Sequence, residues 1–337
     1  MTRIAVALAA CLAGSQVVAG CASKSAAPPP HARYTEPRWQ DAFEDPPEFL
    51  VVVRPKELKH DKVYGPLLRW GIERLREHSG VVSATPLEAI EDAEEVVIGM
   101  HPRTHGDEGA PPDLVMVVVG VRADLDPGVL VDAGGRPLWA PGPNGPVREL
   151  VRERDERGLP LAASLFELPG RTWIIVSGEA RAHAREAFAH PFDRPGMDLD
   201  PEALAVVRID GPALVGRFRA LQTLGAHAAI GRRLRALTLR LPPGASGEVE
   251  VALAYADEDA AAFAEVTARE AIDAIARQKP EKLSWLAAAT VDRGANRVTL
   301  KVPLPRSLID VLLRAGSAGV DADVDIRPPD VSRGDRH

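Results

Sequence analysis

The chain of 337 residues carries 48 acidic and 41 basic side chains, a formal net charge of −7, and only 4% of its residues are aromatic. Phosphate binding needs a concentrated basic surface and single-strand binding needs aromatic stacking platforms, so this composition argues against a nucleic-acid partner. The two cysteines, Cys11 and Cys21, both lie in the first 21 residues. We therefore expect neither thiol catalysis nor a disulfide in the body of the protein, which is long enough to fold on a hydrophobic core.

The first twenty residues have the layout of a secretory signal. Arg3 provides a short basic start, residues 4–13 are apolar, and small residues then lead to Val18-Ala19-Gly20-Cys21. An apolar core of about ten residues is too short for a spanning helix, which needs about twenty. We expect residues 1–20 to be cleaved rather than retained as a membrane helix.

Val18-Ala19-Gly20-Cys21 resembles the lipobox of bacterial lipoproteins, although Val18 stands where leucine is more usual. The resemblance implies that Cys21 receives a diacylglyceryl group before cleavage, and that several fatty acyl chains such as palmitate hold the protein stably on a bilayer. Ala22 replaces the aspartate that favours inner-membrane retention in enterobacterial members, which implies an outer-membrane protein facing the periplasm. The alternative is an ordinary cleaved signal that happens to end near a cysteine.

Residues 21–46 are rich in alanine, proline, serine and charge, with no apolar periodicity, and include Pro28-Pro29-Pro30. This composition is typical of a flexible tether. A coil of this length spans about 25 to 30 Å, so the body can stand clear of the lipid head groups.

Two similar segments open the two halves of the remaining chain. Residues 47–54 read PEFLVVVR and residues 201–208 read PEALAVVR, identical at six of eight positions. β-Branched runs of this kind predict buried strands. The segments after the two copies also correspond in order: a helix, a strand ending in proline, a second strand, two closing strands and a short helix. The ranges are 64–77 and 213–229, 94–102 and 234–242, 113–121 and 248–256, closing strands that start at 161–163 and 286–288, then 172–176 and 297–302, and 180–189 and 306–315.

This order predicts an α+β fold of two tandem, duplicated units, each an antiparallel sheet packed against helices. The units would span residues 47–195 and 196–328, followed by a frayed tail at 329–337. The alternative is two unrelated α+β stretches of similar composition. The second unit also has a long alanine-rich helix at 259–278, where the first has only a short helix candidate at 127–133.

The segment after the first predicted hairpin strand gathers two imidazoles and two carboxylates: His101, His105, Asp107 and Glu108. These donors suit zinc or another divalent ion. Pro102 and Gly106 argue against a helix that would align the rings, so a solvated loop is the alternative. No nucleophile elbow, dinucleotide fingerprint, phosphate-binding loop or His-Glu-x-x-His motif occurs, and we expect no cofactor. His183 and His190 have no acidic partner at matched spacing and are expected at the surface.

An arginine-rich stretch lies between Asp210 and Glu248, an interval that contains no acidic residue. Its arginines are Arg217, Arg219, Arg232, Arg233, Arg235 and Arg240. Arg232, Arg233 and Arg235 are candidates for binding an anionic partner. The alternative is pairing with the acidic stretch of the first unit, which contains Glu88, Glu91, Asp92, Glu94 and Glu95.

Trp139 lies in a Gly/Pro-rich loop at 134–146, where a turn does not need a large aromatic. It is a candidate partner anchor, or it tucks onto its own unit. Trp173 and Trp285 lie in or beside strand patterns and are expected in the core.

These observations predict a lipid-anchored, non-enzymatic binding or scaffolding module of the cell envelope, with the bilayer and an envelope protein as partners. One alternative is an envelope metal-dependent hydrolase that uses residues 101–108. Another is a solute-binding lipoprotein, although that architecture usually has alternating β-α-β units and a parallel sheet.

Overall fold

The computed structural model describes the body of the protein. The described residues are 36–62, 64–78, 82, 85–101, 113–131, 135–154, 160–191, 197, 199–211, 233–243, 247–278, 284–305 and 309. The lipobox with Cys21, most of the tether, the segments at 213–229 and 310–315, and the tail at 329–337 lie outside these residues. No helix within the described ranges is long and apolar enough to span a bilayer.

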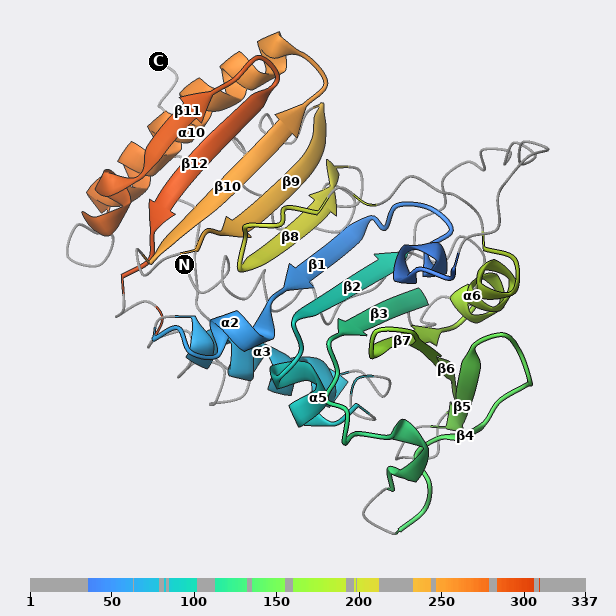
Figure 1. The fold of residues 1–337 in the computed structure, drawn as a ribbon. Helices are drawn as coiled ribbons and strands as arrows, with labels where there is room; N and C mark the ends of the chain where they lie inside the picture. Colours follow the sequence, from blue (N-terminus) through green and yellow to red (C-terminus); the bar gives the residue numbers. More distant parts are fainter. Residues whose placement is uncertain are drawn as a thin grey trace, which may run out of the picture.

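The described strands form one twelve-stranded sheet in the order β11-β12-β10-β9-β8-β1-β2-β3-β7-β6-β5-β4, and every pair in it is antiparallel (Figure 1). The first arm contains β1 (Phe49–Val53), β2 (Glu95–His101), β3 (Asp113–Val119), β4 (Ala140–Pro141), β5 (Arg148–Arg154), β6 (Pro160–Leu168) and β7 (Thr172–Ser177). The second arm contains β8 (Ala205–Asp210), β9 (Leu234–Leu241), β10 (Glu248–Tyr255), β11 (Thr290–Arg293) and β12 (Arg297–Pro303).

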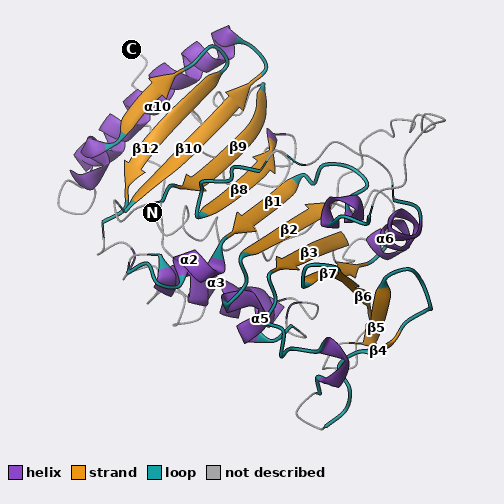
Figure 2. Ribbon diagram, viewed as in Figure 1, coloured by secondary structure: helices purple, strands orange, loops and turns teal. Residues whose placement is uncertain are grey.

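Helices lie on both faces of this sheet (Figure 2). They are η1 (Trp39–Ala42), α2 (Pro55–Leu58), α3 (Gly65–His78), α5 (Leu87–Glu91), η2 (Pro127–Val129), α6 (Ala180–Ala189), α10 (Glu258–Gln278) and η3 (Ser284–Ala288). The predicted α+β class with antiparallel pairing is therefore confirmed. The predicted helices at 64–77, 180–189 and 259–278 are present as α3, α6 and α10. The candidate at 127–133 is only the single 3₁₀ turn η2, because the chain returns to an extended conformation at Leu130.

The two arms meet where the matching segments pair with each other. In the β1–β8 ladder, Val52 lies opposite Val206, the residue that occupies the same position in the second copy of the motif. The strand order β1-β2-β3-β7-β6 in the first arm is repeated as β8-β9-β10-β12-β11 in the second. We expected two sheet-and-helix units side by side, and their strands instead join in one sheet. The duplication and the unit boundaries stay predictions.

The first arm is buried on both faces. Residues of α3 and α5 pack with Val96 and Ile98 on one face, while α6 and η1 pack with Val97 and Val117 on the other. Because both faces are covered, β2 and β3 are nearly continuous apolar runs rather than alternating ones.

In the second arm, α10 covers the same face as α3 and α5. The clusters around these helices share the partly buried Val51 and Met100. The inward residues of α10 are small, with Ala261, Ala264 and Ala268 against the sheet, so the helix lies close to β10 and β12.

Candidate functional site

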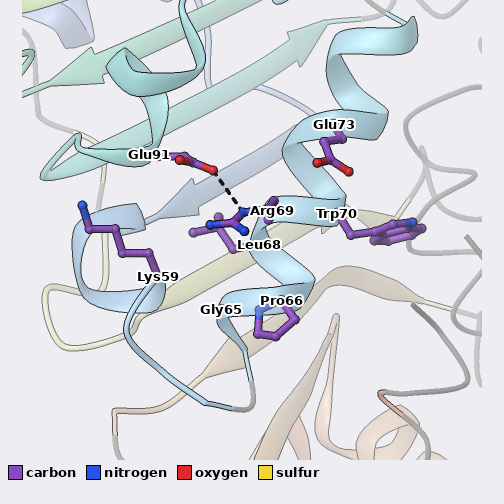
Figure 3. Close-up of a pocket in the computed structure, with 8 residues that line it drawn as sticks. All are labelled: Lys59, Gly65, Pro66, Leu68, Arg69, Trp70, Glu73 and Glu91. Atoms are coloured by element: carbon purple, nitrogen blue, oxygen red, sulfur yellow. Dashed lines mark ion pairs between the residues drawn. The ribbon is translucent and has the colours of Figure 1, made fainter. Parts of the chain in front are cut away.

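A cavity of about 420 Å³ opens between the α2–α3 turn and α5 (Figure 3). It is lined by Lys59, Gly65, Pro66, Leu68, Arg69, Trp70, Glu73 and Glu91. A Cβ at Gly65 would lie 2.9 Å from the carbonyl oxygen of Lys59, so glycine is what allows α3 to begin this close to α2. The cavity is therefore a consequence of how α2 turns into α3.

Three of the charged residues that line this cavity, Lys59, Arg69 and Glu91, form ion pairs. Arg69 Nε lies 3.5 Å from Glu91 Oε1, and Lys59 donates a hydrogen bond to Asp92. That hydrogen bond lowers the pKa of the Asp92 carboxyl. The lining residues include no histidine, serine, threonine or cysteine. The mixed charge of the cavity selects no single ligand class.

The predicted metal ligands fall at the edge of the described chain. His101 ends β2, with its backbone opposite Asp113 of β3. Its ring, and all of His105, Asp107 and Glu108, lie outside the described residues. Within the described ranges, no group of three or more histidine, cysteine, aspartate or glutamate side chains is placed to hold a metal ion. The metal site stays a prediction.

Trp139 does not serve as an exposed anchor, so that candidate interpretation was wrong. Its side chain is only 2% exposed and belongs to the same core cluster as Leu165 and Trp173. The indole lies inside this cluster, and Leu130 and Leu138 from the same part of the chain pack against the cluster. Trp173 is in the core as predicted, whereas Trp285 is only half-buried and lies outside the buried core.

The arginine-rich stretch is described only in part, since Arg217, Arg219 and Arg232 lie outside the described residues. Arg233 pairs with Asp257 at 2.6 Å, and Arg240 pairs with Asp200 and Glu250. Arg235 is exposed. Arg233 and Arg240 therefore pair with residues of the second arm, or with Asp200 just before it, rather than with the acidic stretch.

The acidic stretch is likewise paired locally. Glu95 lies 3.5 Å from Arg54, while Asp92 and Glu91 pair with Lys59 and Arg69. The expected pairing between the two stretches is thus not made by these described members.

A buried polar network that sequence reasoning missed links α6 to β5 and β6. Glu149 is 7% exposed and accepts hydrogen bonds from Arg185 Nε and Nη2 at 2.9 and 2.6 Å. It also accepts one from Ser164 Oγ at 2.6 Å, and Ser164 Oγ accepts one from Arg181 Nε at 3.0 Å. The two arginines belong to α6, whereas Glu149 and Ser164 belong to β5 and β6. The network therefore holds α6 on the sheet.

Four large apolar side chains are exposed in the described part of the chain, and they form two pairs. Val129 and Val131 are 71% and 56% exposed, and Phe263 and Val266 are each 55% exposed. The valines lie on a loop that Asp126 ties to Arg148 at the start of β5, with 3.1 Å between Oδ1 and Nη1. Phe263 and Val266 lie on α10, which packs on β10, β11 and β12. The two pairs are therefore near opposite ends of the sheet (Figure 1).

No family model matches the chain, and no curated protein matches it significantly. The crystal structure of TP0453 in crystal form I is similar to it with a TM-score of 0.45 and 9% sequence identity, over 83% of this chain and 97% of that chain. A likeness this weak says nothing about what the chain binds.

Proposed function

We propose that the protein is a lipid-anchored scaffolding module of the bacterial cell envelope, held to a membrane through acylated Cys21 and contacting protein partners through its body. The observation that carries the proposal is the placement of the two exposed apolar pairs, Val129 with Val131 and Phe263 with Val266. Clustered exposed apolar side chains mark interaction surfaces more often than isolated ones do.

The sheet sets the distance between these pairs. Neighbouring strands lie about 4.8 Å apart, so a twelve-stranded sheet extends about 50 Å from edge to edge before twist is considered. The strands of the first arm are buried on both faces, so this part of the spacer is closely packed. A scaffold of this kind would hold two partners at a fixed separation.

The alternatives have less support in the described residues. Antiparallel pairing throughout the described sheet differs from the alternating β-α-β units usual in solute-binding lipoproteins. The hydrolase alternative depends on His101, His105, Asp107 and Glu108, whose side chains lie outside the described residues.

The proposal is tested in the native envelope with a photo-crosslinking amino acid at position 129 or position 263. Position 186, exposed on α6, is the matched control. We expect discrete crosslinked protein bands from 129 and 263 that differ from each other, none from 186, and loss of palmitate labelling in the Cys21→Ser protein. Absence of crosslinked protein from both test positions would contradict the scaffold, and palmitate labelling of the Cys21→Ser protein would contradict the anchor.

A further inference from the structure

The outward face of α10 carries a regular stripe of exposed residues. Its members are spaced alternately four and three residues apart and are all exposed: Asp259, Phe263, Val266, Glu270, Asp273 and Arg277. The inward residues Ala261, Ala264 and Ala268 pack on the sheet. A spacing of four and three is the one along which a second helix stays in contact with the first.

The two apolar members of this stripe have no role in the fold. Phe263 and Val266 are both more than half exposed, so they contribute little to the core. Phenylalanine and valine are also poorer helix formers than alanine, which fills most neighbouring positions of α10. Neither packing on the described residues nor helix propensity accounts for them.

The apolar pair is flanked by carboxylates. Asp259 precedes it by one turn, and Glu270 and Asp273 come after it. The ion pairs described for α10 join Glu258 and Glu265 to Arg269 and Arg293 and leave these three carboxylates facing solvent. Because Glu270 and Asp273 are three residues apart on a helix, their charges repel and cost helix stability. Arg277, at the far end, is the one basic member of the stripe.

A lipid surface does not fit this pattern. Helices that lie in a membrane interface have a wide apolar face bordered by lysine and arginine, which attract anionic lipids. Here two apolar side chains are bordered by acids, which anionic head groups would repel. The charge instead complements a protein surface with basic side chains around an apolar centre.

We propose that the stripe from Asp259 to Arg277 receives a helix of a partner protein that has an apolar centre and lysine or arginine on either side of it. The stripe is about 27 Å long at 1.5 Å per residue, so the partner helix would have about five turns. Phe263 and Val266 would be the central contacts, and Glu270 and Asp273 would choose the partner by charge. This inference depends on the proposed scaffold function and names the partner for one of its two ends.

The test uses the full chain with Cys21→Ser and two fluorescein-labelled, alanine-based helical peptides. Both peptides carry leucines at the centre; one has flanking lysines and the other has glutamates at the same positions. Fluorescence anisotropy should show binding of the lysine peptide at least about ten-fold tighter than the glutamate peptide, and weaker binding as salt is raised.

Three variants make the test specific. Phe263→Ser with Val266→Ser should weaken binding of the lysine peptide about ten-fold or more, because both central contacts are lost. Glu270→Lys with Asp273→Lys should reverse the preference between the two peptides. Val129→Ser with Val131→Ser is the matched control and should bind as the parent chain does. Circular dichroism checks that each variant keeps its helix content.

Equal binding of the two peptides, no binding of either, or binding that ignores Phe263 and Val266 would overturn the inference. So would Phe263-dependent binding to phosphatidylglycerol vesicles. If the peptide tests give one of these results while position 129 still crosslinks to an envelope protein, then α10 does not bind a partner helix but the scaffold function is still supported.

Discussion

The hydroxyl of Tyr64 donates a hydrogen bond of 2.8 Å to the backbone carbonyl oxygen of Glu248, which lies 184 residues further along the chain. Tyr64 precedes α3 in the first arm, and Glu248 opens β10 in the second. The ring is almost completely buried with Leu58 and Leu204. This contact joins the arms at a second place, apart from the β1–β8 ladder.

We expect Tyr64→Phe to lower the free energy of unfolding by about 1 kcal/mol, because the buried carbonyl oxygen loses its donor. Tyr255→Phe is the matched control. The Tyr255 hydroxyl is buried with no hydrogen-bond partner among the described residues, so its removal should be neutral or stabilising. Urea unfolding measures both, and an equal loss in the two variants would contradict the role given to the Tyr64 hydroxyl.

The raised pKa of Tyr64 predicts that the protein loses stability at alkaline pH. Burial, followed by the nearby carboxylates Asp61 and Glu248, raises the pKa of Tyr64 from 10.0 to about 12. Below pH 10 the Tyr64 hydroxyl keeps its proton in both the folded and the unfolded chain, so its full contribution to stability is present. Between pH 10 and 12 the unfolded chain ionises first, so stability falls as pH rises. The advantage of the parent chain over Tyr64→Phe should therefore shrink by about 1 kcal/mol between pH 9 and 11 in urea unfolding. A constant difference would show that Tyr64 titrates normally.

Removing the partner of the buried Glu149 should be costly. Arg185→Met leaves this carboxylate with Ser164 alone, and we expect a loss of about 2 kcal/mol, reduced from the usual buried value because Arg185 is partly exposed. Adding Glu149→Met should restore part of that loss, since the unpaired charge is gone. Arg122→Met, which breaks surface pairs with Asp124 and Asp92, is the control and should have a much smaller effect on urea unfolding. An Arg185 loss no larger than that of Arg122 would contradict a buried pair.

Trp139 and Val129 lie near each other in sequence but should respond in opposite ways to mutation. Trp139→Ala removes a core side chain, and we expect about 3 to 5 kcal/mol of lost stability in thermal or urea unfolding. Val129→Ser changes an exposed loop position and should alter stability by less than about 0.5 kcal/mol. If Trp139→Ala left stability unchanged, the indole would have to lie at the surface.

Local elements were predictable where their pattern is strong. The apolar run at 47–54 forms β1 because β-branched runs favour buried strands, and the alanine-rich segment ended by Pro280 forms α10 because its apolar residues follow helical spacing. β5 was missed, since RELVRER reads as a polar segment. Glu149 and Arg152 are buried there only because neighbouring elements supply partners and cover, which no single strand pattern reports.

The candidate sites divide in the same way. The spacing of the stripe on α10 can be read from the sequence. Which face of the helix packs on the sheet is decided by the contacts with β10 and β12. The sequence left Trp139 either as a partner anchor or as a side chain tucked onto its own unit, and only the tertiary structure decided for the second.

The sequence by itself determined the strongly patterned elements, such as β1 and α10, and that the strands pair in antiparallel fashion, because apolar runs, helical spacing, prolines and glycines act within a few residues. Only the tertiary structure decided that Val52 would face Val206 and make one sheet of two arms. Apolar alternation selects the face of a strand, whereas the free backbone groups at its edge can pair with any strand brought beside it.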